Sequence, residues 1–133
     1  MVAVIITSVG ILSYYRHYYN YPKELVHADS LLNCSQNQGS TYLCSIKRMD
    51  WSSTTDWYYR LLFIKGKVKT QDEFDASDIE EATKVSLHYE SWNADKRQLP
   101  FAYYYLGRIY SCIDNMPMAL EFYHKSLKND SFR

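Results

Sequence analysis

One stretch near the C-terminus, residues 101–127, constrains the fold more than any other part of the chain. Apolar and aromatic side chains recur in it every three or four residues, the period of an amphipathic helix. Pro100 and Pro117 predict the first turns of two successive helices. The small residues Gly107 and Ala119 let two helix axes approach closely. The stretch therefore predicts a tightly packed antiparallel helix pair.

The composition agrees with a helical, globular chain of one domain. Only four Gly and three Pro occur among 133 residues, and 47% of the residues are apolar, which argues against a disordered chain or a many-turned β protein. Fifteen basic and fifteen acidic residues cancel, so the chain lacks the positive field that a nucleic-acid binder normally needs. We therefore expect an all-α protein without a nucleic-acid partner.

The same helical period predicts further helices upstream. A polar break is expected at Gln36 to Ser40 and another polar segment at residues 52–55, while Ser77 and Glu80 match the capping-box pattern at a helix start. The helices expected before residue 100 cover residues 22–33, about 42–49, 56–69 and 77–92.

Small residues recur along the chain in a way that indicates an internal repeat. Gly66 and Gly107 are 41 residues apart, and Ala82 and Ala119 are 37 apart. We expect each of these four residues to lie where the two helices of a pair approach closely.

Six positions in residues 101–127 resemble the signature of the tetratricopeptide repeat (TPR), W-x2-L-G-x2-Y followed by A-x3-F. The resemblance implies a right-handed stack of about three antiparallel helix pairs over residues 22–133, and a protein that binds other proteins. The region 22–128 is also similar to the helical sensor region of bacterial TPR regulatory proteins anchored in the cell envelope. The six matching residues are Tyr103, Leu106, Gly107, Tyr110, Ala119 and Tyr123.

TPR proteins generally bind their ligands on the concave face formed by the first helix of each pair. Aromatic rings and cations on that face would suit an extended acidic or aromatic peptide. Lys65 and Lys69 stand where the repeat pattern expects Leu and Tyr, so a one-residue slip of the second repeat is left open. Carried over by position, the candidate groove consists of Phe101, Tyr104, Arg108 and Ser111, with Phe63, Lys67 and Thr70 as the equivalents in the second repeat.

Residues 1–15 contain no charged side chain and precede a polar, aromatic link that ends at residue 21. Three interpretations stay open for this segment: a membrane anchor, a degenerate export signal, or a helix packed on the repeats. We expect a membrane-associated chain in the cell envelope, with a cytoplasmic chain as the alternative.

Sequence motifs of catalysis and of metal or cofactor binding are missing. The four His are scattered, and Gly is too scarce for a phosphate-binding loop. Six acidic residues between Asp72 and Glu81 match no calcium-binding loop and suit the start of a helix. The three Cys show no zinc-site spacing, although a bridge between Cys34 and Cys44 is left open. We therefore expect no enzyme, no cofactor and no metal.

The function predicted from sequence is that of a protein–protein interaction module that binds a peptide or a protein surface in a TPR groove. One alternative is a membrane-anchored sensory or regulatory fragment that lacks its output domain. Another is a small structural protein associated with a membrane. The last helix pair has no polar capping helix after it in this sequence, so self-association through that pair is a further expectation.

Overall fold

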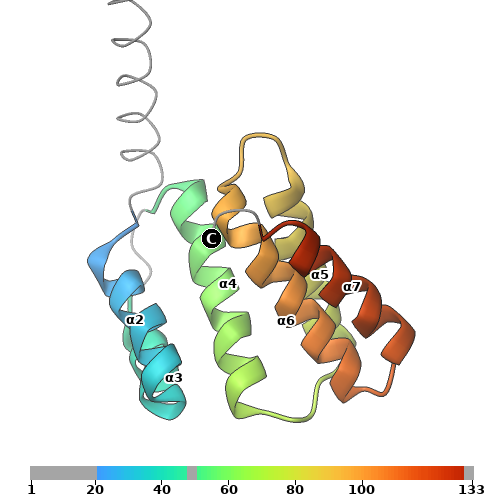
Figure 1. Ribbon diagram of the computed structural model, residues 1–133. Coiled ribbons are helices and arrows are strands. Elements are labelled where there is room, and N and C mark those ends of the chain that lie inside the picture. The colour runs from blue at the N-terminus through green and yellow to red at the C-terminus, as the bar shows by residue number, and fades with distance from the viewer. Residues whose placement is uncertain (1–20, 48–50, 131–133) are drawn as a thin grey trace, which may run out of the picture.

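The computed structural model describes residues 21–47 and 51–130, and every regular element in these ranges is helical (Figure 1). The all-α prediction is therefore confirmed for this part of the chain. The predicted N-terminal segment, residues 1–15, lies outside the described residues. The elements are α2 (Lys23–Cys34), α3 (Gln36–Ser45), α4 (Ser53–Thr70), α5 (Ala76–Glu90), the 3-10 helix η1 (Lys96–Gln98), α6 (Leu99–Cys112) and α7 (Met116–Lys128).

A single residue joins α2 to α3. Ser35 has an extended backbone, and its N–H donates to the carbonyl of Leu31 at 2.7 Å, which closes α2 as α3 begins. Gly39 lies so near α2 that a Cβ on it would be 2.6 Å from the backbone nitrogen of Leu32. The predicted break at Gln36 to Ser40 was wrong because this glycine serves close helix packing instead of ending a helix.

Two other helix starts differ from the prediction. The Ser52 hydroxyl caps α4 by accepting from the Thr55 N–H at 3.3 Å, so residues 52–55 form a cap and first turn instead of a link. The capping box of α5 consists of Asp75 and Asp78, not of Ser77 and Glu80. Each of the two Asp side chains accepts from the backbone N–H of the other, at 3.0 and 2.9 Å. Aspartate caps a helix N-terminus as well as serine does, so the capping-box pattern alone could not distinguish Asp75 and Asp78 from Ser77 and Glu80.

The turn between α6 and α7 permits the close pairing that the sequence predicts. Asp114 has a positive φ of 62°, and the Asn115 side chain caps α7 by accepting from the Met118 N–H. A Cβ on Gly107 would lie 2.8 Å from the Tyr123 ring and 3.2 Å from the carbonyl oxygen of Ala119. The close approach predicted at Gly107 is therefore confirmed.

Helix α4 separates two apolar cores and contributes to both. Leu61, together with residues of α5 and α6, belongs to the first core. Leu62, together with residues of α2 and α3, belongs to the second. Gly66 faces Ser40 and Leu32 rather than α5, so the prediction that it marks the close approach of its own helix pair was wrong. Within the described ranges, α3 and α5 each pack on α4 without packing on each other.

Candidate binding grooves

The surface of the described residues includes two hollows that are large enough to hold a ligand or part of a partner protein. The first is a three-helix groove of about 380 Å³ with walls from α2, α4 and α6. The second is an α4–α5 groove of about 730 Å³. The three-helix groove is lined by Asp29, Asn33, Leu61, Leu62, Lys65, Lys69, Gln98, Pro100, Phe101, Tyr104, Tyr105, Ser126 and Asp130. The α4–α5 groove is lined by Asp56, Tyr59, Arg60, Phe63, Ile64, Lys67, Phe74, Ser77, Asp78, Glu81 and Ile109.

Two exposed aromatic rings form one wall of the three-helix groove. Phe101 is 51% exposed and Tyr104 is 45% exposed, although both lie on a helix whose opposite face is buried. The Tyr104 ring is in contact with the rings of Tyr105 and Tyr123, with centroids 5.8 Å apart in each case. These contacts hold Tyr104 in place while leaving part of its face open to a partner.

A partly buried ion pair lies in the lining of the three-helix groove. The Asp29 carboxylate on α2 accepts hydrogen bonds from the Tyr58 hydroxyl at 3.1 Å and from the Lys65 ammonium group, both on α4. The Lys65 side chain is only 8% exposed, so its charge depends on Asp29 for compensation. Burial and the neighbouring Asp29 raise the pKa of Tyr58, which keeps its hydroxyl protonated as a donor.

A second polar cluster lies beside the first. The Tyr21 ring stacks on Tyr58 with centroids 3.9 Å apart, and its hydroxyl donates to Asp95 at 2.8 Å. Two nitrogens of the Arg97 guanidinium also donate to Asp95, each at 2.9 Å. Burial favours the neutral acid, but the hydrogen bonds from Arg97 and Tyr21 outweigh it and hold the pKa of Asp95 below its usual value. This cluster ties the segment before α2 to the loop before α6.

Several polar groups in or beside the three-helix groove have no partner among the described residues. Within residues 21–47 and 51–130, Lys69 and Arg108 make no ion pair, and Lys69 is exposed. The side-chain amides of Asn33 and Gln98 likewise have no hydrogen-bond partner within these ranges. An amide side chain can pair with the backbone of an extended peptide, and a lysine can pair with a carboxylate.

The groove residues predicted from sequence do not gather in one place. Phe101 and Tyr104 line the three-helix groove, whereas Phe63 and Lys67 line the α4–α5 groove. The remaining three line neither. Thr70 donates its hydroxyl to the carbonyl of Gly66 at 2.8 Å, Ser111 lies 3.9 Å from the sulfur of Met116, and Arg108 is partly exposed on α6.

Sequence reasoning missed the part that α2 and α4 play in the three-helix groove. Lys65 and Lys69 occupy it where Lys67 and Thr70 were expected, and Asp29 was not predicted at all. The sequence signal for the two lysines was their departure from the Leu and Tyr of the predicted repeat pattern, because a shift of the predicted positions by one or two residues reaches Lys65 and Lys69. No sequence pattern pointed to Asp29, because its pairing with Lys65 arises only from the packing of α2 beside α4.

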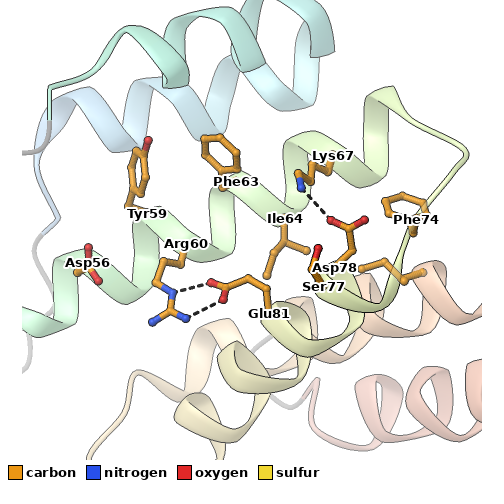
Figure 2. Close-up of a pocket in the computed structure, with 11 residues that line it drawn as sticks. Asp56, Tyr59, Arg60, Phe63, Ile64, Lys67, Phe74, Ser77, Asp78 and Glu81 are labelled. Carbon is orange, nitrogen blue, oxygen red and sulfur yellow. Dashed lines mark hydrogen bonds and ion pairs between the residues drawn. The ribbon is translucent and has the colours of Figure 1, made fainter.

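Polar side chains join α4 to α5 along the second groove. The Arg60 guanidinium donates to both carboxylate oxygens of Glu81 at 2.6 and 2.8 Å, and Lys67 donates to Asp78 at 2.8 Å (Figure 2). The hydrogen bonds from Arg60 hold the pKa of Glu81 below its usual value. Nearby, the rings of Trp57 and His88 stack with centroids 4.3 Å apart.

Between these links, the α4–α5 groove is apolar and aromatic. Its floor includes Ile64 and Ile109, which are buried, and Phe63 on α4 is 37% exposed. Figure 2 shows Tyr59 and Phe63 side by side along α4, with Phe74 at one end of the groove. The groove therefore presents aromatic side chains along a helix, framed by two ion pairs.

No family model, curated protein or solved structure matches the chain. Among the described residues, no cluster of His, Cys, Asp or Glu could hold a metal ion. Cys34, Cys44 and Cys112 are free thiols, so the bridge left open between the first two is not formed. No helix of the described part is long and apolar enough to span a membrane.

Proposed function

We propose that this chain is a protein-binding helical module that holds an extended peptide in the three-helix groove. The observation that carries the proposal is the exposure of Phe101 and Tyr104 in a hollow that α2, α4 and α6 build together. Large exposed aromatic rings in a concave site are a usual feature of surfaces that bind partners.

The proposal includes a TPR-like stack of three helix pairs, α2 with α3, α4 with α5, and α6 with α7. The order of packing supports it, because α3 packs on α4 and α5 packs on α6, while α2, α4 and α6 lie next to one another in turn. The close contact of Gly107 with Tyr123 and Ala119 agrees with the spacing on which the resemblance rests. In such a stack, the first helices of successive pairs form one continuous binding face.

The chemistry of the groove favours a peptide with aromatic and acidic side chains. Phe101 and Tyr104 offer ring faces and Lys69 offers a cation, while Arg108 lies beside the groove, one turn from Tyr104 on α6. Neither cation has an ion-pair partner in the described part of the chain. Asn33 and Gln98 supply amides for the backbone of an extended chain. The ion pair of Lys65 with Asp29 keeps α2 and α4 in register beneath the ligand.

A displayed library of random twelve-residue peptides, selected on the wild-type protein, tests this function. We expect enrichment of peptides with aromatic and acidic residues, and loss of their binding when Tyr104→Ala is combined with Arg108→Glu. Phe101→Ala should weaken the same peptides by about tenfold, which is typical of an aromatic residue central to a binding site.

Leu87→Ala is the matched control, because Leu87 is exposed on α5 and lines neither groove. Its binding should equal that of the wild type. The proposal is wrong if the selected peptides bind the Tyr104→Ala, Arg108→Glu variant as tightly as the wild type.

A further inference from the structure

We propose that the α4–α5 groove is a second interaction surface, which binds a basic amphipathic helix of a partner protein. It is separate from the three-helix groove, with which it shares no lining residue. The inference therefore stands or falls independently of the proposed peptide function.

The apolar part of the groove is long enough for a short helix. From Asp56 to Lys67 the groove follows α4 for about three turns, roughly 16 Å at 1.5 Å per residue. Phe63 and Tyr59 lie one turn apart along this length, with Ile64 beside them and Phe74 at one end (Figure 2). A helix with apolar side chains every three or four residues matches such a row.

The polar groups of this groove do not suit an extended chain. Arg60 is paired with Glu81, and Lys67 is paired with Asp78, so these charges are engaged across the groove. The lining contains no Asn or Gln that could pair with a peptide backbone, in contrast to the three-helix groove. An occupant must therefore satisfy its own backbone hydrogen bonds, as a helix does.

The charge around the groove selects a basic partner. The end marked by Phe74 carries three exposed carboxylates, those of Asp72, Glu73 and Asp75. Hydrogen bonds from Ser77 and from backbone N–H groups lower the pKa of Asp75, so this group is ionised at neutral pH. Between Gln71 and Ser77 the sequence contains no cation to offset them. Lysine or arginine beside the apolar stripe of a partner helix complements this charge.

The test uses a synthetic fourteen-residue peptide with leucine at positions 3, 7, 10 and 14 and lysine at the flanking positions. Binding to the full chain is followed by fluorescence anisotropy, and helix formation by circular dichroism. Two matched peptides are controls: one has the same composition with the leucines spread around the helix, and the other has glutamate in place of every lysine. We expect only the basic amphipathic peptide to bind and to gain helix on binding.

Two kinds of variant locate the bound peptide. Phe63→Ser should weaken binding by about tenfold, because Phe63 is an exposed aromatic residue within the groove. The double variant Asp72→Lys, Glu73→Lys should bind the lysine peptide more weakly and its glutamate counterpart more tightly. Both residues are exposed, so the substitutions leave the apolar core intact. Phe101→Ala, in the other groove, should leave binding unchanged.

Several results overturn the proposal. Equal binding of the rearranged peptide means that no helical stripe is recognised, and loss of binding in Phe101→Ala places the peptide in the three-helix groove. Concentration-dependent self-association that Phe63→Ser abolishes assigns the groove to a second copy of this chain. The proposal is likewise contradicted if the basic peptide binds Phe63→Ser and the Asp72→Lys, Glu73→Lys variant as tightly as it binds the wild type.

Discussion

The helix pairs α6–α7 and α4–α5 differ in the side chains that lie between their two helices. In α6–α7, Gly107 admits the Tyr123 ring and the backbone at Ala119, so the two helices meet through small residues. In α4–α5, Gly66 faces away from the partner helix, toward Ser40. Besides the apolar core that α4 and α5 share with α6, long polar and aromatic side chains join this pair along one side, where they line a groove of about 730 Å³.

The difference shows how a helical domain forms a groove where two of its helices are linked by long side chains. Long side chains such as Arg60 and Glu81 reach across from α4 to α5, whereas α6 and α7 meet at Gly107 and Ala119. A chain built only from pairs like α6–α7 would be more regular and would lack the α4–α5 groove.

The largest expected effect is that of Gly107→Leu, which removes the close approach on which α6–α7 depends. A Cβ here already lies 2.8 Å from the Tyr123 ring, so the remaining leucine atoms must push α7 away. We expect the free energy of unfolding to fall by about 3 kcal/mol or more, measured by urea denaturation. Gly107→Ala is the control and should cost much less. Unchanged stability in Gly107→Leu would contradict the packing described for this pair.

The second prediction concerns Gly39→Ala, which tests the close approach of α2 and α3. The new Cβ would lie 2.6 Å from the backbone nitrogen of Leu32, and a backbone cannot rotate aside as a side chain can. We expect a loss of about 2 kcal/mol, even though alanine favours helix by about 1 kcal/mol over glycine. Denaturation combined with hydrogen exchange in α2 and α3 measures it. Equal stability would mean that α2 and α3 can separate at no cost.

The third prediction concerns the polar links that hold α4 to α5. A double-mutant cycle with Arg60→Met and Glu81→Gln should give a coupling energy of about 1 kcal/mol, because the pair is bidentate and partly buried. The same cycle on Glu80 and Lys84, an exposed pair within α5, should give only about 0.3 kcal/mol. Coupling no larger than in this control would mean that the link does not hold the pair together.

How much of this could be predicted from sequence differs between the two pairs. For α6–α7, the periodicity, Pro117 and Gly107 together specify the helices and their contact, because each signal is local. For α4–α5, the helices were predictable but their separation was not. A glycine does not reveal which neighbour it faces, and Gly66 faces the preceding pair.

The same limit applies to the grooves. Phe101 and Tyr104 could be placed on one face of α6 because the helical period of residues 101–127 fixes the orientation of that helix, and both line the three-helix groove. Lys65 could not, since its place depends on the rotation of α4 between two apolar cores. The α4–α5 groove was not predicted, because it arises from pairings such as Arg60 with Glu81 that span 21 residues.

A smaller loss of stability is expected when the pH is lowered, and it should be greater in α4–α5 than in α6–α7. Burial against neighbouring groups, and the positive charges of Arg60 and Lys96, lower the pKa of His88, which stacks on Trp57. Below the ordinary histidine pKa of 6.5, the unfolded chain therefore binds a proton more readily than the folded one. This contribution to stability is complete above about pH 6.5 and is lost as the pH falls through the lower, folded pKa.

Hydrogen exchange at pH 7.5 and pH 5.5 measures this effect separately in each pair. After each rate is divided by the intrinsic exchange rate at that pH, acidification should lower the protection of α4 and α5 more than that of α6 and α7, because His88 lies on α5 and stacks on α4. His88→Phe keeps an aromatic ring without a titrating group and should flatten the response. An equal response of both pairs in the wild type would mean that His88 does not act on α4–α5 in particular.

The smallest effect is predicted for Gly66→Ala, and it gives the sharpest contrast with Gly107. A Cβ at Gly66 would lie 2.9 Å from the Ser40 hydroxyl, which is buried, has no hydrogen-bond partner among the described residues and can rotate away. Because alanine is also the better helix former, the cost and the gain should nearly cancel, and stability should change by less than about 0.5 kcal/mol. Ser40→Ala combined with Gly66→Ala removes the hydroxyl and should be at least as stable as the wild type by urea denaturation. A loss of 2 kcal/mol in Gly66→Ala would show that α4 packs on α3 as tightly as α6 packs on α7, and the contrast between the two glycines would then be wrong.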